Sequence, residues 1–346
     1  MTLLQNIKTK ALKQAFFVRS GLYFAESIPL QIFENYMVRG ELGFQKVPID
    51  EKFIIEDVRA LIEKDAENIS KGVYPLSVVG VDRPISHVKN LMRIYLDSVN
   101  VVLNKKHNRH KEFSPDTKRK AEDVPDYYKR NFHNQTDGYL SKDSAELYDH
   151  QVEILFRGTS DAIRRMMIEA LKKFYKADKK YKIVEVACGT GVSTRPLALT
   201  FKDSKIQSFD LSSDYIAHAK QKNAYKNVEY KVSMGESLEA VKDGSMDIWC
   251  STFLFHELPK DVRKKVIKEA YRVLKPGGRM FILDSIQEHD RPDLKPILDL
   301  FPQNFHEPFY KNYVMNPIED MISEAGFTDV DSFYRASGKV AFGLKK

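Results

Sequence analysis

The second half of the chain alternates short apolar runs with amphipathic stretches, and this pattern restricts the fold more than any other feature of the sequence. Apolar runs predict strands at residues 181–187, 205–210, 227–232, 245–251 and 278–284. Helical periodicity predicts helices at residues 193–201, 212–222 and 260–273. Such alternation is typical of βαβ units around a mainly parallel sheet. The sequence therefore predicts an α/β fold with a Rossmann-like, doubly wound sheet.

The C-terminal end departs from this alternation. Residues 328–334 and 339–344 are two further strand-like runs, separated by the short turn Ala336-Ser337-Gly338. Strands joined so closely pair antiparallel. We therefore expect an antiparallel hairpin at the edge of the sheet in place of another crossover.

The first part of the chain has a mainly helical pattern, with clear segments at residues 3–18, 50–70 and 86–103. A polar, charged stretch with two prolines, residues 104–125, is the best candidate for a linker. A further helix is expected over residues 142–175. We therefore predict a helical accessory domain at residues 1–125, which caps a substrate or mediates dimerisation, and a second domain at residues 126–346 that contains the sheet.

The first helix has its own apolar stripe, formed by Leu4, Ile7, Ala11, Ala15, Val18 and Leu22. Its lysines lie mostly on other faces of the helix. The favoured interpretation is a helix that docks on its own protein or on a twin subunit. A membrane-surface helix and an organelle-targeting sequence remain alternatives.

Composition indicates a soluble, globular protein. Hydrophobic residues make up 42% of the chain and charged residues 30%, and no apolar window is long enough to span a bilayer. The two cysteines, Cys188 and Cys250, are too few for a disulfide framework or a zinc site. With no secretory signal at the N-terminus, these features predict a cytoplasmic location.

Basic residues are in excess, with a net charge of +7 and their densest run at residues 105–120. That run lacks the interleaved aromatic residues of a base-stacking surface, so a solvated segment is the preferred interpretation. We do not expect nucleic acid as a partner. Contact with a membrane surface and formation of a homodimer are left open by the sequence.

A glycine-containing turn follows the first predicted strand, in the stretch from Ile183 to Gly191. Glycine at positions 189 and 191 lets the backbone approach a ligand closely. A dinucleotide fingerprint would place a third glycine at position 194, which is Thr194. The nicotinamide interpretation is weakened accordingly.

Two acidic residues accompany this turn. Glu185 lies just before it, and Asp210 ends the next predicted strand. A carboxylate at that strand end can accept hydrogen bonds from the two vicinal hydroxyls of a ribose. The pair therefore indicates a nucleoside-containing cofactor.

From about residue 145 onward the chain resembles the class I S-adenosylmethionine-dependent methyltransferases. Five motifs match in order: Glu185 with Gly189 and Gly191, Asp210-Leu211-Ser212, Gly235-Glu236-Ser237, Asp247–Ser251, and Arg272–Gly278. Ala187 stands where the family more often has its first glycine. The resemblance implies S-adenosyl-L-methionine as cofactor, bound by Glu185, Ala187, Gly189, Gly191, Asp210, Leu211, Gly235, Glu236, Ser237 and Ser251.

Methyl transfer from a sulfonium is an in-line displacement that needs a base only when the acceptor must lose a proton. The candidates for acid–base catalysis are His256, His306 and Glu307, which lie where family members place their substrate. The candidates for substrate binding are His133, Gln135, Tyr139, Tyr148, Phe255, Phe305 and Tyr310. Structural hydrogen bonds or packing are the alternative for each. Adjacent His-Glu pairs rarely aim at one ion, so no metal is predicted.

The acceptor is expected to be a small molecule. The run Ser251-Thr252-Phe253-Leu254 differs from the Asn/Asp-Pro-Pro-aromatic run of amino-methylating family members. Residues 245–285 resemble the branch that includes the ubiquinone and menaquinone C-methyltransferases. Aromatic residues over 301–313 favour an apolar or aromatic acceptor. The alternatives are an RNA or protein methyltransferase and a non-catalytic S-adenosylmethionine-binding sensor or partner subunit.

Overall fold

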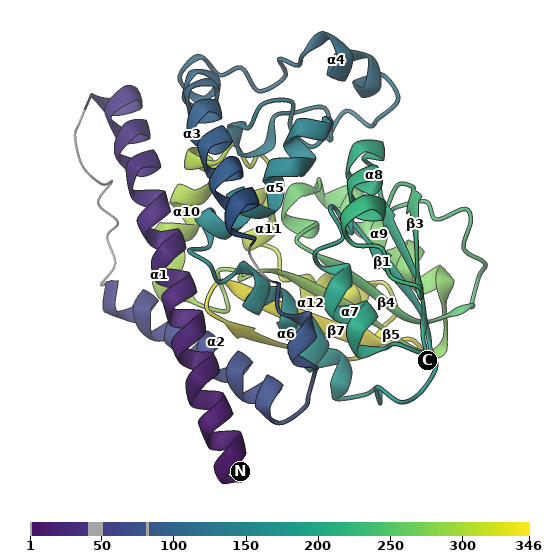
Figure 1. Cartoon of the computed structure of the whole chain (residues 1–346). Coiled ribbons are helices and arrows are strands. Elements are labelled where there is room, and N and C mark those ends of the chain that lie inside the picture. Colours follow the sequence, from purple (N-terminus) through teal and green to yellow (C-terminus); the bar gives the residue numbers. More distant parts are fainter. Residues whose placement is uncertain (1, 41–50, 81–82) are drawn as a thin grey trace.

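A computed structural model describes residues 2–40, 51–80 and 83–346, and within these residues it contains one seven-stranded sheet (Figure 1). The strands are β1 (Lys182–Val186), β2 (Lys205–Asp210), β3 (Val228–Val232), β4 (Met246–Thr252), β5 (Leu274–Ser285), β6 (Thr328–Arg335) and β7 (Gly338–Leu344). Every strand predicted from the sequence is present.

The strand order is β3-β2-β1-β4-β5-β7-β6. Strands β1 to β5 pair in parallel, whereas β7 pairs antiparallel with β5 and β6 pairs antiparallel with β7. The Rossmann-like sheet and the antiparallel edge hairpin are thereby confirmed. The order reverses between β1 and β4, and ligands of doubly wound sheets bind beyond the carboxyl ends of the strands at such a reversal.

Both faces of the sheet are covered, which explains the nearly continuous apolar strands. Ile183 of β1 packs with α6 (Ser160–Lys172) and α7 (Thr194–Thr200) on one face. Its neighbour Val184 packs on the other face with α9 (Lys260–Val273) and α12 (Ile318–Glu324). The remaining helices of this half are α5 (Lys142–Leu155), α8 (Ser213–Lys222), α10 (Lys295–Asn304) and α11 (Tyr310–Val314).

The N-terminal helices stand together beside the sheet (Figure 1). They are α1 (Leu3–Arg39), α2 (Glu51–Ser70) and α3 (Pro84–His107). Helix α1 and helix α3 contact α5, and α2 contacts α6 and β6. Helix α1 is much longer than the predicted segment 3–18. Residue 50, where the second predicted segment begins, lies outside the described residues. In the described part of the chain, no helix has the length and apolar character needed to cross a membrane.

The apolar stripe predicted to dock α1 on its own protein faces outward. Leu4 and Val18 are 76% and 74% exposed, whereas Phe16 and Tyr23 turn toward the rest of the chain. The predicted docking of α1 on its own protein is confirmed by its contacts with α2, α3 and α5, but the face that docks is not the apolar stripe. Docking of the stripe on a second copy stays a prediction.

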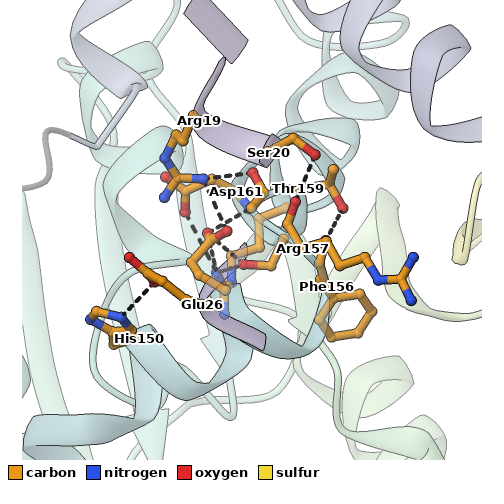
Figure 2. A network of polar contacts seen from close by, with 12 residues as sticks. Arg19, Ser20, Glu26, His150, Phe156, Arg157, Thr159 and Asp161 are labelled. Carbon is orange, nitrogen blue, oxygen red and sulfur yellow. Dashed lines mark hydrogen bonds and ion pairs between the residues drawn. The ribbon is translucent and has the colours of Figure 1, made fainter. Parts of the chain in front are cut away.

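Those polar contacts meet the chain where α5 ends and α6 begins (Figure 2). Arg19 donates to the carbonyl oxygen of Gly158 over 2.6 Å, and Ser20 Oγ donates to the carbonyl oxygen of Arg157 over 2.8 Å. Arg157 and Gly158 have φ angles of 50° and 76°, and a right-handed α-helix cannot continue through residues with positive φ angles. The single helix predicted over 142–175 is thus wrong, because the chain turns there to receive α1.

The predicted linker at 104–125 is partly helical and packed. Helix α3 continues to His107, and a short helix, α4, covers Pro115–Ala121. The amide of Asn131 donates to the carbonyl oxygens of Arg109 and Glu112 over 3.2 and 2.8 Å. The polar composition therefore reflects exposure on one side while the other side packs against the segment that follows.

Gly158 is a position where a side chain has no room. A Cβ there would lie 3.0 Å from Ser20 Cα and 3.0 Å from the Tyr23 ring, at a φ angle that alanine rarely adopts. We expect Gly158→Ala to lower the free energy of unfolding by about 1–3 kcal/mol in urea denaturation. The matched control is Gly21→Ala, at a position in α1 with open space around it. This change should raise the free energy of unfolding by about 0.5–1 kcal/mol. Equal effects of the two changes would contradict this account of how α1 docks.

Candidate functional site

A pocket opens beyond the carboxyl ends of β1, β2 and β4, at the reversal of strand order. The empty space in it is about 710 Å³ when the open solvent at its mouth is counted. The lining residues that the sequence predicted as site residues are Ala187, Gly189, Asp210, Leu211, Gly235, Glu236, Tyr139 and Tyr148. The lining therefore joins the glycine turn to residues that lie far from it in sequence.

The turn after β1 is tied to the end of β2. The backbone N–H of Gly189 donates to Asp210 Oδ2 over 2.8 Å, and that of Cys188 donates to the Phe209 carbonyl oxygen over 3.0 Å. Ala187 has a φ angle of 58°, a left-handed conformation that costs an alanine about 1–2 kcal/mol. The turn thus keeps the backbone shape that glycine favours although position 187 carries a methyl group.

Asp210 presents its carboxylate to the pocket. Oδ2 accepts from Gly189, and Oδ1 accepts from the Ser212 N–H over 2.9 Å. Each carboxylate oxygen has further lone-pair capacity, so the group can also accept from two hydroxyls of a ligand. Burial raises the pKa of Asp210, while the backbone donors favour its ionised form.

Glu185 lies beneath the turn and does not line the pocket. Its Oε2 accepts from Thr194 Oγ1 over 2.6 Å and from Ser208 Oγ over 2.7 Å, and burial raises its pKa. Thr194, at the position of a third fingerprint glycine, therefore holds the start of α7 to β1. Glu185 can support the turn that a cofactor would touch.

Three other predicted cofactor residues also lie outside the lining: Gly191, Ser237 and Ser251. A Cβ at Gly191 would lie 2.8 Å from Tyr230 Oη, so this glycine permits packing against β3. Ser251 is buried within β4, and Thr252 and Phe253 reach the pocket instead. On the opposite side of the mouth, Glu236 Oε1 accepts from Tyr127 Oη over 2.7 Å.

Aromatic side chains form the wall that faces the turn. The rings that line it are Tyr127, Tyr128, Tyr139, Tyr148, Tyr215 and Phe253. Tyr139 stacks on Phe132 with ring centroids 5.3 Å apart and donates to Glu257 Oε1 over 2.6 Å. Sequence reasoning missed Tyr127 and Tyr128 as lining residues, although both belong to the aromatic run that contains Tyr139.

His256, a predicted base, is fixed by a carboxylate that the sequence analysis missed. Its Nδ1 lies 2.6 Å from Asp284 Oδ1, and Asp284 Oδ2 accepts from the Phe255 N–H over 2.7 Å. Burial alone would lower the pKa of His256, but the carboxylates of Asp284 and Glu307 outweigh it and raise that pKa to about 10. At this pKa the imidazole is protonated at neutral pH, and the role of His256 as a base stays a prediction.

Glu257, the neighbour of His256, is the acidic group that reaches the pocket from this side. Its Oε1 lies 3.8 Å from His256 Nε2, and burial raises its pKa to about 7 despite that imidazolium. A carboxyl group with this pKa can take up a proton near neutral pH. Of this pair, His256 is the predicted base, and Glu257 is the member that lines the pocket.

Glu307 and His133 meet behind Glu257. Glu307 Oε1 lies 3.1 Å from His133 Nε2, and His133 Nε2 lies 3.9 Å from Glu257 Oε1. Burial lowers the pKa of His133 to about 3, so its ring is neutral. Burial also raises the pKa of Glu307 well above its ordinary value. These two predicted residues thus join Glu257 in one cluster.

The remaining predicted residues lie around this cluster without lining the pocket. His306 stacks on His110 with centroids 3.5 Å apart, and burial lowers its pKa to about 4. Phe255 is enclosed against Trp249. The other three hold the surrounding loops: the Gln135 amide donates to the Gly138 carbonyl oxygen, Phe305 packs on His133, and Tyr310 Oη lies 2.8 Å from Ser285 Oγ.

Residues 183–278, which run from β1 into β5, match the model of a family described as a methyltransferase domain. The chain is 27% identical over 242 residues to the ubiquinone/menaquinone biosynthesis C-methyltransferase UbiE of Rhizobium johnstonii, covering 63% of this chain and 90% of that protein. It is 25% identical to the demethylmenaquinone methyltransferase of Chlorobaculum parvum, and the match covers 54% of this chain and 78% of that protein. A solved methyltransferase from Aquifex aeolicus, described as SAM dependent, aligns with a TM-score of 0.39 and 20% identity over 51% of this chain and 88% of that one.

The raised pKa of His256 links stability to pH. Because the folded-state pKa lies above the unfolded value of about 6.5, the stabilisation is complete below pH 6.5 and is lost as the pH rises through 10. We expect the stability advantage of the wild type over His256→Gln to shrink across this range, measured by urea denaturation at each pH. The control, His107→Gln at the exposed end of α3, should give a curve parallel to the wild type. A constant difference for His256→Gln would refute the charged pair with Asp284.

Proposed function

The chain belongs to the class I S-adenosylmethionine-dependent methyltransferase superfamily, and we propose that it transfers the methyl group of this cofactor to a small aromatic molecule. The observation that carries the proposal is the Asp210 carboxylate beside the turn of Gly189, at the mouth of an aromatic pocket. This arrangement supplies acceptors for a ribose and backbone room for the rest of a nucleoside.

The proposed cofactor contacts follow from the lining. Asp210 would accept from the ribose hydroxyls, and Glu236 with Leu211 and Gly235 would flank the adenine. Glu185 would act through the turn that it supports, with Thr194 and Ser208 holding its carboxylate. The methionine end of the cofactor would then point toward Ala187 and the aromatic wall.

The acceptor would lie between the cofactor and Glu257. Tyrosine rings supply flat apolar surfaces, and the hydroxyl of Tyr139 holds the Glu257 carboxylate. Two relatives carry names that refer to quinone methylation, which supports an aromatic acceptor of quinol type. In the reaction, the acceptor's electron pair forms the new bond to carbon while the S–CH₃ bond pair stays on sulfur. Glu257 would take the proton that the acceptor loses.

The N-terminal residues 1–125 would act as the accessory domain that holds the aromatic wall in place. The side chain of Asn104 donates to the carbonyl oxygen of Asn134 over 3.2 Å, and Thr136 donates to Asp97 Oδ1 over 2.7 Å. Helix α3 is thereby attached to the segment that contributes Tyr139. This attachment supports a substrate-capping role for the helical part of the chain.

Removal of the Asp210 side chain tests the cofactor assignment. We expect Asp210→Ala to weaken binding of S-adenosylhomocysteine about 100-fold in calorimetric titration, because two charge-assisted hydrogen bonds are lost. The control, Asp203→Ala, removes an exposed carboxylate near the opposite end of β2 and should leave the affinity unchanged. Unchanged affinity in Asp210→Ala, or tighter binding of NADH than of S-adenosylhomocysteine by the wild type, would contradict the assignment.

Methyl transfer itself is measured with methyl-labelled S-adenosylmethionine and a panel of acceptors. The panel contains reduced quinones and phenols, total RNA, and a mixed protein substrate. We expect label in an aromatic small molecule, and loss of that label with Asp210→Ala. Label in RNA or protein alone, or cofactor binding without transfer to any acceptor, would each rule out the proposed acceptor class.

A further inference from the structure

We propose that His133, Glu257 and Glu307 form a binding site for a divalent transition-metal ion at the inner end of the acceptor pocket. The site rests on the proposed function for its role, since its open coordination positions would face the acceptor. Its existence as a metal site is independent of that function. The three residues come from separate segments, so the adjacent His-Glu pairs considered in the sequence gave no signal of it.

The distances between the ligand atoms suit one ion. His133 Nε2 lies 3.1 Å from Glu307 Oε1 and 3.9 Å from Glu257 Oε1, and the three ligand atoms all lie within 4.8 Å of one another. An ion bound about 2.0–2.2 Å from nitrogen and oxygen ligands has those ligands roughly 3–4 Å apart. The cluster therefore needs little rearrangement to surround an ion.

Glu307 supplies an independent sign that a ligand is needed. Its side chain is buried, with the residue 1% exposed, yet neither carboxylate oxygen receives a hydrogen bond within the described residues. Burying a carboxylate without a donor or a cation is costly. The carboxylate points at His133 and Glu257, so an ion at their centre would satisfy it.

The charge balance of the cluster leads to the same conclusion. The single imidazolium of His256 is paired with Asp284 and also lies 3.8 Å from Glu257 Oε1, so one positive charge serves the carboxyl groups of Asp284, Glu257 and Glu307. In the described ranges, neither Glu257 nor Glu307 forms an ion pair with a lysine or arginine. Without a further cation, burial raises the pKa of Glu257 and of Glu307 and favours their protonated forms, whereas a bound divalent cation would hold both groups as carboxylates.

The ligand set indicates both the class of ion and its role. One imidazole nitrogen and two carboxylates suit Mn²⁺, Fe²⁺ or Zn²⁺, and they leave positions for water or substrate oxygen. A bound cation would hold an acceptor hydroxyl as its oxyanion and so ease loss of its proton. An ion at this position would select an aromatic acceptor with an oxygen next to the methylated atom.

Two other groups of metal-ligating side chains provide the comparison. In the first, both carboxylate oxygens of Glu26 already contact imidazole nitrogens, those of His87 and His150. In the second, Glu319 lies beside His289 but is neutralised by Lys339 over 2.7 Å. Glu319 Oε2 also lacks a hydrogen bond, but the charge of Lys339 compensates this carboxylate, whereas Glu307 has no lysine or arginine partner in the described ranges.

The test titrates Mn²⁺ and, separately, Zn²⁺ into the full chain loaded with S-adenosylhomocysteine, with calorimetry and the Mn²⁺ paramagnetic resonance signal as readouts. We expect one ion per chain in the wild type. Glu307→Gln and Glu257→Gln should each weaken binding at least about tenfold, whereas Glu26→Gln and Glu319→Gln should not. Unfolding curves of the variants, recorded in parallel, identify any that fail to fold; Glu307→Asp then replaces Glu307→Gln.

No binding of either ion, or binding that survives Glu307→Gln and is lost in Glu26→Gln, would overturn the proposal. Transfer of label to an amine in the absence of a metal would also overturn it, because an ammonium group would then be what the two carboxylates compensate. Failure of S-adenosylhomocysteine to bind is a separate result. It would refute the proposed function, and the metal titration would be repeated on the unloaded chain.

Discussion

The hydrogen bond from the Gly189 N–H to the Asp210 carboxylate is the contact on which the rest of the site depends. It joins the turn after β1 to the end of β2 at the point where the strand order reverses. Glu185 supports the same turn from below through Thr194 and Ser208. Because these contacts fix the backbone, Ala187 is held in a left-handed conformation that glycine would adopt without strain.

A second organising feature is the enclosed group of acids and histidines beyond the pocket. Low polarity strengthens the charge interactions there, so the neighbouring carboxylates raise the pKa of His256 against the effect of burial, whereas burial itself raises the pKa of Glu257. The protonated imidazole of His256 is held by Asp284, and Glu257 lines the pocket. The proposed roles in proton transfer and in cation binding therefore both involve Glu257, next to Glu307.

The N-terminal helices matter to the site through the segments they hold. Helix α1 docks at the break between α5 and α6, and helix α3 is attached to the loop that carries His133 and Tyr139. The aromatic wall and one side of the acid–histidine cluster thus depend on residues before the methyltransferase domain. Asp210 and Gly189, by contrast, are held to each other at the ends of β2 and β1.

The sequence by itself determined the sheet, its edge hairpin and the glycine-containing turn after β1. Strand periodicity, the turn glycines and the strand-end Asp210 are local signals, and local backbone preferences express them directly. Tertiary structure decided the rest. The outward stripe of α1, the break at Gly158 and the meeting of His133, Glu257 and Glu307 arise from contacts between segments more than 40 residues apart. No local pattern encodes such contacts, because burial and charge compensation are set by all the neighbours of a residue at once.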